Sequence, residues 1–216
     1  MKVAILSESA ADDAAIRILV DHLLGTRTQA PKMPPLRSRG WPSVRQVLPK
    51  VLKHLHYHTD ADALVVVVDA DASPIHKIAH VGPGPCVEAC RLCALRANVD
   101  LTMRDLQPRP TRSPMETALG LAVPAIEAWL RCGLPGAISE QAWARTLTPS
   151  SAREHGIRLK REVYGSDRAP GSVKRQRAIE EAQRIGQDLA DLESNFPVGF
   201  GALARDIRGW HAGWTL

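Results

Sequence analysis

Two patterns of apolar residues alternate along this chain. Short runs that are almost entirely apolar occupy residues 2–6, 64–68 and 118–123, and the central run is Leu64 followed by four valines. Runs of this length without polar alternation are typical of strands buried on both faces of a sheet. A further short strand is predicted at residues 100–104.

Between these runs, apolar residues recur at the three-to-four-residue spacing of amphipathic helices. The predicted helices span residues 11–24, 43–55, 86–97, 124–132, 151–164, 173–194 and 197–210. Strands that alternate with helices favour an α/β fold with an open, mostly parallel sheet flanked by helices. We expect this core to cover residues 1–135, and a helical C-terminal extension packed on the core to cover residues 136–216.

Acidic residues follow the predicted strands. Asp69 and Asp71 come directly after the central strand, Glu8 follows the first strand, and Glu127 follows the last one. In a parallel sheet the carboxyl ends of the strands share one edge, and ligands usually bind there. Carboxylates that converge repel one another, and a divalent cation such as Mg²⁺ would neutralise them. The alternative is structural, because an acid after a strand often closes a turn or caps a helix.

Positive charge is unevenly distributed along the chain. The 216 residues carry a formal net charge of +5, and the basic residues gather in two zones. Residues 26–53 hold no acid, and residues 158–177 form the second zone. Zones of this kind suit a polyanion such as nucleic acid. The candidate phosphate contacts are Arg37, Arg39, Lys160 and Lys174.

The composition limits the cellular setting. With 44% hydrophobic residues the chain can form a substantial core, yet no apolar stretch approaches the roughly 18 residues of a membrane span. The N-terminal residues do not have the pattern of a signal peptide. We therefore expect a cytoplasmic protein with no membrane partner, and in that compartment four cysteines give no reason to infer disulfides.

Three motifs follow one another in a recognisable order. Glu8 follows the first strand, the pair Asp69-x-Asp71 ends the central strand, and residues 124–130 read Pro-Ala-Ile-Glu-Ala-Trp-Leu. The first two resemble the Toprim domain of topoisomerases, primases and OLD-family nucleases. The third matches the Pro-x-x-Glu-(Ala/Ser)-Trp-Leu signature of small stand-alone bacterial Toprim-like proteins. A basic and aromatic segment and a terminal Phe-rich helix of that family are matched by Lys160, Tyr164 and residues 196–207.

The resemblance implies a Mg²⁺-dependent nuclease, with DNA favoured over RNA as the substrate. In the family the glutamate acts as a general acid or base and the Asp-x-Asp pair holds Mg²⁺, for which Mn²⁺ can substitute. These roles fall on Glu8, which is also a possible ligand, and on Asp69 and Asp71, with Glu127 as a further ligand. The resemblance also implies a phage-defence or toxin–antitoxin setting with an ATPase partner. The sequence has no phosphate-binding glycine motif of its own, so any ATP chemistry must come from that partner.

Two alternatives remain open on the same residues. Ser9 and Ala72 stand where many Toprim proteins have glycine, which is compatible with a Toprim-fold module that binds nucleic acid or a partner without catalysis. The segment around Asp69 also looks like the nucleophile loop of haloacid-dehalogenase phosphatases. That family usually begins with its motif, however, whereas here a strand and a helix precede it.

Cysteines and histidines form a second group of candidates. One predicted helix carries three cysteines with the spacing of a radical-SAM iron–sulfur motif, Cys86, Cys90 and Cys93. On one face of a helix they are better explained as small buried apolar residues. A structural zinc site would need a histidine from the preceding loop, His76 or His80. A cluster at the end of the second helix is interpreted as surface residues, namely His54, His56 and His58.

Overall fold

The computed structural model describes residues 1–34, 40–76, 89–109 and 113–210 of the chain. Its strands are β1 (Val3–Leu6), β2 (Ala63–Asp69) and β3 (Glu116–Ala122). The helices of the first half are α1 (Ala10–Leu24), α2 (Gly40–His58) and α3 (Arg91–Arg104). Those of the second half are α4 (Ile126–Leu130), α5 (Glu140–Thr146), α6 (Ala152–Tyr164), α7 (Gly171–Ile185), α8 (Leu189–Asn195) and α9 (Phe200–Gly209).

The strands form an open sheet in the order β1-β2-β3, and both pairings are parallel. Ile5 lies opposite Val65, and Val67 lies opposite Gly120. Parallel strands require crossover connections, and helices supply them here. All carboxyl ends of the strands therefore point to the same edge of the sheet.

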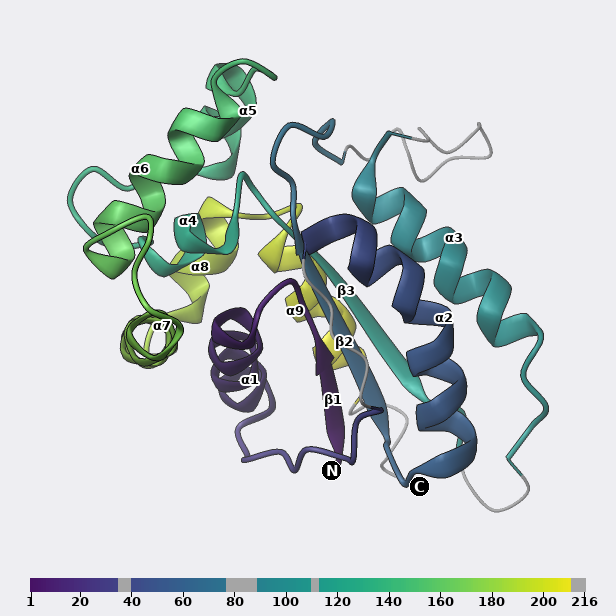
Figure 1. Cartoon of the computed structure of the whole chain (residues 1–216). Coiled ribbons are helices and arrows are strands. Elements are labelled where there is room, and N and C mark those ends of the chain that lie inside the picture. The colour runs from purple at the N-terminus through teal and green to yellow at the C-terminus, as the bar shows by residue number, and fades with distance from the viewer. Residues whose placement is uncertain (35–39, 77–88, 110–112, 211–216) are drawn as a thin grey trace.

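Helices cover the sheet and bury its residues. In Figure 1, α1 lies to the left of the strands, α2 and α3 lie to the right, and α9 lies behind β3. The contacts agree, because α2 packs on α3 and on β2, whereas α9 packs on β3 and on α1. Every residue of β2 from Ala63 to Val68 is buried, as a strand with neighbours on both sides and helices on both faces requires.

The later helices share this core. The helix α7 packs against α1, and α6 packs against both α4 and α7. Gly120 of β3 allows α9 to approach closely, because a Cβ there would lie 3.2 Å from Leu203 Cδ2 and 3.1 Å from Val67 Cγ2. Figure 1 shows α4, α5 and α6 gathered beyond the carboxyl ends of the strands. These helices therefore stand over the edge where the acidic residues were expected.

The structure confirms the α/β class and the open parallel sheet, and it corrects several elements. The strand predicted at residues 100–104 is wrong, since this segment is the last part of α3. Its buried residues follow helical spacing, Leu92, Leu95, Val99 and Thr102, and Leu101 is 63% exposed. The helix predicted over residues 173–194 is divided into α7 and α8, and α5 was not predicted. Within the described residues, no helix combines the length and apolar character that crossing a bilayer requires.

Candidate functional site

The carboxylates after the three strands lie together. Glu8 follows β1, and its Oε1 accepts a hydrogen bond of 3.0 Å from the backbone N–H of Asp69 at the end of β2. Asp69 Oδ1 in turn accepts a hydrogen bond of 2.9 Å from the N–H of Ile126, the first residue of α4. A chain of two hydrogen bonds thus joins the ends of β1 and β2 to the helix that follows β3.

The backbone beyond β2 is held in a tight turn. The N–H of Ala70 donates to the carbonyl of Ala122 and that of Asp71 to the carbonyl of Pro124, at 2.7 and 2.8 Å. Asp71 has a φ of +46°, a left-handed conformation that aspartate tolerates better than most residues. Its side chain is 57% exposed. Asp71 therefore stands at the open side of the site, whereas Asp69 lies inside it.

Arg91 connects the acidic residues to α3. Its Nη1 donates to the carbonyl oxygen of Asp69 at 2.6 Å and to Asp71 Oδ2 at 2.9 Å. The same atom lies 3.8 Å from Glu8 Oε1, and the guanidinium stacks on the ring of Trp41. Arg91 was not predicted as a site residue from the sequence, because only the fold brings the first turn of α3 to the end of β2.

Asp12 is a further acid that the sequence analysis did not single out. It lies in the first turn of α1, where its N–H donates to the capping Ser9 Oγ at 3.2 Å. Burial raises the pKa of Asp12 to about 7, and repulsion from Glu127 adds to the shift. Its position in the sequence could have predicted its place in the site, because a helix that directly follows β1 begins at the same edge of the sheet.

Burial raises the pKa values of the other acids too. Burial, and next the charges of Glu127 and Asp12, hold the pKa of Asp69 well above its usual range. Burial is also the main cause of the raised pKa of Glu8. Glu127 is only 3% exposed, and its pKa is raised by burial although Lys160 opposes the shift. The acids of this site are therefore ones that an additional cation would stabilise.

Basic and phenolic groups face these acids from the second half of the chain. Burial alone would lower the pKa of Lys160 on α6, but attraction to Glu127 and Asp69 raises it. Tyr164, one turn further along α6, is buried, and burial and the charge of Glu127 raise its pKa, so it stays a phenol. Lys174 on α7 also lowers the pKa of Glu127. Of the other predicted phosphate contacts, Arg37 and Arg39 lie outside the described residues.

The donor set suits a hard divalent cation. Glu8, Asp69, Asp71 and Glu127 offer only carboxylate oxygens, which Mg²⁺ prefers. Glu127 Oε2 is buried and has no hydrogen-bond partner among the described residues. Arg91 and Lys160 offset only part of the negative charge, since Asp12 adds a fifth carboxylate to the same group. The donor types therefore agree with a cation of this class, although among the described residues no three of these carboxylates bring their oxygens within 4.8 Å of one another.

A cavity lies beside this group of acids and does not include it. Its volume is about 870 Å³, and its walls come from the turn after Asp71, from α5 and from the segment before α9. Glu140 lies in this wall, and its carboxylate accepts hydrogen bonds from the N–H groups of Val198 and Gly199 at 2.8 and 2.9 Å. The cavity begins at Ala72, next to Asp71, and so borders the exposed side of the site.

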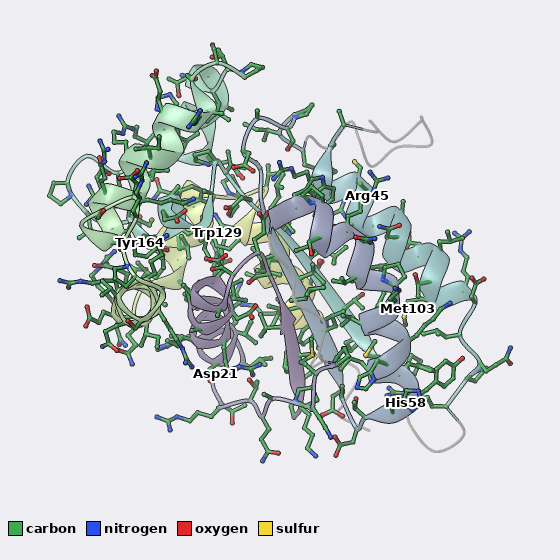
Figure 2. All side chains as sticks on the ribbon, in the orientation of Figure 1. Asp21, Arg45, His58, Met103, Trp129 and Tyr164 are labelled. Carbon is green, nitrogen blue, oxygen red and sulfur yellow. The ribbon has the colours of Figure 1, made fainter. Side chains whose placement is uncertain are left out.

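The histidine and cysteine predictions are partly corrected. His56, expected at the surface, is buried, and its Nε2 lies 2.8 Å from the carbonyl oxygen of Gln107. Cys90 and Cys93 are buried as expected. His76 lies beside them, with its ligand atom within 4.8 Å of both sulfur atoms. Cys86 and His80 lie outside the described residues. Trp129 (labelled in Figure 2) is fully buried and packs edge-on against Phe200, so it belongs to the core.

Comparison of the chain with protein-family models, with curated proteins and with solved structures gives no match. The site itself therefore provides the evidence on function. Acids converge at one edge of the sheet, they are largely buried, and cationic side chains lie against them.

Proposed function

We propose that this chain is a metal-dependent phosphodiesterase, a nuclease of Toprim type that uses Mg²⁺ or Mn²⁺. The observation that carries the proposal is the meeting of Glu8, Asp69, Asp71 and Glu127 from three strand ends, with the pKa values of Glu8, Asp69 and Glu127 raised by burial. Such a group is costly to fold around, because each carboxylate disfavours ionisation of the others. A function that uses a cation accounts for that cost.

The residues that would hold the cation are Asp69, Asp71 and Glu127, with Glu8 beside them. A bound divalent ion supplies Lewis-acid activation of a phosphate oxygen and stabilises the charge that develops during the displacement. Asp69 is oriented by the N–H of Ile126, which fixes one of its oxygens. Asp71 is the exposed member of the group and stands where an incoming phosphate would first meet the site.

Glu8 is the proposed general acid or base. Its pKa is raised by burial and by the charge of Asp71, and a carboxyl whose pKa is closer to neutral transfers protons more effectively at that pH. The N–H of Asp69 binds Oε1, so the orientation of the carboxyl group is set by the end of β2. Lys160, Lys174 and Arg91 are the proposed phosphate contacts close to this group, because the charge or side chain of each acts on one of its acids.

The proposed substrate is nucleic acid, with DNA favoured over RNA. The support is the two basic zones of the sequence, which include Arg37 and Arg39, together with the position of Lys160 beside the acids. The resemblance to stand-alone Toprim-like proteins adds an ATPase partner and a phage-defence or toxin–antitoxin setting to the proposal.

The test is cleavage by the purified protein of plasmid, linear and single-stranded DNA and of RNA, with Mg²⁺ or Mn²⁺. Glu8→Gln should abolish cutting, because it removes the proton-transfer group and preserves the size of the side chain. Glu116→Gln is the matched control, since Glu116 begins β3 at the opposite edge of the sheet. Cutting that persists in Glu8→Gln, or that needs no divalent ion, would refute the proposed mechanism.

A second function has one observation in its favour. The carboxylates already have partners within the protein, since Glu8 binds the N–H of Asp69, Asp69 binds that of Ile126 and Asp71 pairs with Arg91. An arrangement of this kind can persist as structure in a module that binds nucleic acid without cutting it. That module would bind DNA equally well before and after Glu8→Gln, with or without Mg²⁺, and would cut none of the substrates.

A further inference from the structure

A second group of ligand-type side chains lies outside the acidic site. His76 Nδ1 lies 3.6 Å from Cys90 Sγ and 3.5 Å from Cys93 Sγ, and the three atoms all lie within 4.8 Å of one another. All three side chains are buried. Cys90 caps the N-terminus of α3 and Cys93 lies in its first turn, while His76 comes from the segment after β2.

The separations fit a tetrahedral zinc ion. With zinc bonds of about 2.3 Å to sulfur and about 2.05 Å to nitrogen, tetrahedral geometry places each sulfur about 3.6 Å from the nitrogen. Both observed separations agree with that value. The donor types agree as well, because thiolate and imidazole are the ligands that structural zinc sites use most.

We propose that His76, Cys90 and Cys93 bind a Zn²⁺ ion. The site is chemically distinct from the carboxylate group, where the oxygen donors suit a hard ion. Three protein ligands leave one of the four tetrahedral positions for a further group. When the ion binds, the two thiols each release a proton to solvent and bond as thiolates, and His76 bonds through the lone pair of Nδ1.

Arg96 contacts the other ring nitrogen of His76. Arg96 Nη1 lies 3.1 Å from His76 Nε2, and a guanidinium only donates, so Nε2 accepts and Nδ1 carries the proton in the structure. Zinc binding through Nδ1 would therefore require the proton of His76 to move to Nε2, where it would replace the hydrogen bond from Arg96.

A zinc ion at this site would hold Arg91, the residue that connects α3 to the acids, in place. Arg91 lies between the two cysteines in the sequence, and it contacts Asp69, Asp71 and Glu8. A zinc ion at Cys90 and Cys93 holds the first turn of α3 and thereby holds the backbone of Arg91. His76 follows Asp71 closely along the chain, so the ion also ties the segment after β2 to α3. Closing a loop in this way stabilises the folded state.

The experiment is metal analysis of the full chain purified under reducing conditions. We expect about one zinc per chain by mass spectrometry. Replacement by Co²⁺ should give thiolate-to-cobalt charge-transfer absorption and the visible bands of a tetrahedral ion. Cys93→Ser and His76→Ala should weaken zinc binding by roughly tenfold or more, because each removes one of three ligands.

The matched control is Cys132→Ser. Cys132 is also buried, but its Sγ donates to Asp191 Oδ2 at 3.3 Å and lies in another part of the fold. This variant should keep the zinc content and the cobalt spectrum of the unchanged protein. Circular dichroism checks that every variant folds, and the cobalt spectrum of the unchanged protein tests the site even if a variant does not.

Three results would overturn the proposal. The first is a reduced protein that retains no zinc after incubation with the ion and removal of the excess. The second is a cobalt spectrum without thiolate ligands, and the third is an equal loss of zinc in Cys132→Ser. None of these measurements depends on nuclease activity. The zinc site and the proposed nuclease function are therefore tested independently of each other.

Discussion

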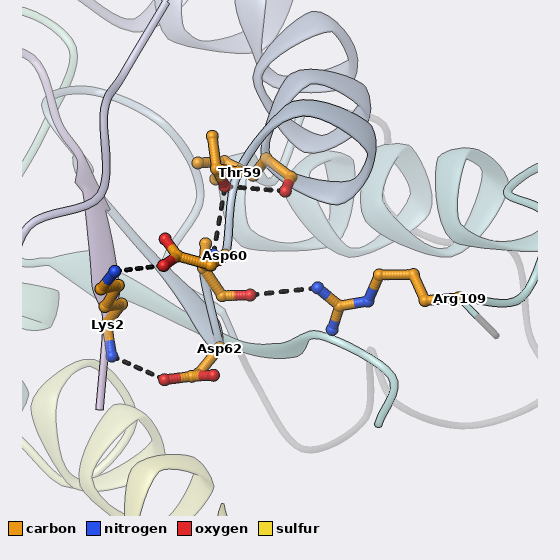
Figure 3. A network of polar contacts seen from close by, with 7 residues as sticks. Lys2, Thr59, Asp60, Asp62 and Arg109 are labelled. Carbon is orange, nitrogen blue, oxygen red and sulfur yellow. Dashed lines mark hydrogen bonds and ion pairs between the residues drawn. The ribbon is translucent and has the colours of Figure 1, made fainter. Parts of the chain in front are cut away.

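The two edges of the sheet use charge in opposite ways. At the amino edge, shown in Figure 3, the N–H of Lys2 donates to Asp62 Oδ2 at 2.7 Å, and the Lys2 ammonium pairs with Asp60. Arg109 Nη1 donates to the carbonyl oxygen of Ala61 at 3.1 Å, and Thr59 bridges the end of α2 to the N–H of Ala61. Here the polar groups of neighbouring segments complement one another close to solvent.

At the carboxyl edge, acids gather against one another. The pKa values of Glu8, Asp12, Asp69 and Glu127 are all raised, mainly by burial. An arrangement that disfavours its own charged state adds nothing to stability by itself. The same sheet therefore has one edge where opposite charges pair and one where acids raise one another's pKa values.

The largest difference should be in activity. Asp69→Asn removes an ionisable carboxyl group at the carboxyl edge and keeps an oxygen for the N–H of Ile126. We expect it to lower metal-dependent cleavage by about a hundredfold or more, as the loss of a group that stabilises charge in the transition state does. Asp62→Asn is the matched change at the amino edge and should leave the rate unchanged. Equal losses in both variants would remove the distinction between the edges.

The next effect is on stability as a function of pH. A carboxyl whose pKa is raised on folding binds more protons in the folded state, so its contribution to stability is present at low pH and is lost as pH rises through the folded pKa. With no divalent ion added, the melting temperature should fall between about pH 5 and about pH 8, where Asp12 titrates near pH 7.

Magnesium ions should reverse that loss. The added ion should raise the melting temperature more at the higher pH than at the lower one, because only ionised carboxylates bind it. Asp69→Asn should show a weaker dependence on pH and a smaller response to Mg²⁺, since it removes an acid whose pKa burial holds well above its usual range. A melting temperature that is independent of both pH and Mg²⁺ would contradict this account.

A smaller effect is expected in nucleic-acid binding. Lys160→Met removes the cation that faces Glu127 and Asp69. It should weaken binding and reduce the slope of log affinity against log salt by about one, as expected for one lost phosphate contact. Lys2→Met, which removes a lysine from the amino edge, should leave the slope unchanged. A slope that does not respond to Lys160→Met would exclude this residue from the interface.

The smallest effect should come from the pair of Lys2 and Asp60. Both side chains are partly exposed, and exposed ion pairs contribute only about 0–1 kcal/mol to stability. Asp60→Asn should therefore change the free energy of unfolding in urea by less than about 1 kcal/mol. A larger loss would mean that the amino edge depends on this pair more than its exposure indicates.

The sequence predicted the frame of the site well. Uninterrupted apolar runs predict parallel strands, and parallel strands bring the residues at their carboxyl ends to one edge. Glu8, Asp69 and Glu127 could therefore be grouped before any coordinates were known. The segment at residues 100–104 was misassigned because two apolar residues in alternation, Leu101 and Met103, fit a short strand as well as the end of a helix. Only its continuation from Arg91 through Val99 reveals the helical spacing.

The rest of the site depends on packing between distant segments. Arg91 meets Asp69 because the first turn of α3 abuts the end of β2. Tyr164 meets Glu127 because α6 packs on α4. No local pattern encodes such contacts, since they depend on the angles at which helices pack. His76 was considered from the sequence as a possible zinc ligand. Its position beside Cys90 and Cys93 could not be predicted, because it depends on how the segment after β2 packs on α3.

The left-handed backbone conformation of Asp71 makes the residue found at position 71 in related sequences informative about function. Glycine, asparagine and aspartate all adopt a φ of +46° more readily than other residues do, so the turn alone would accept any of the three. Only aspartate also provides a negative charge. Among related sequences, free exchange of these three residues at position 71 would mean that selection acts on the shape of the turn. Retention of aspartate alone would mean that it acts on the charge.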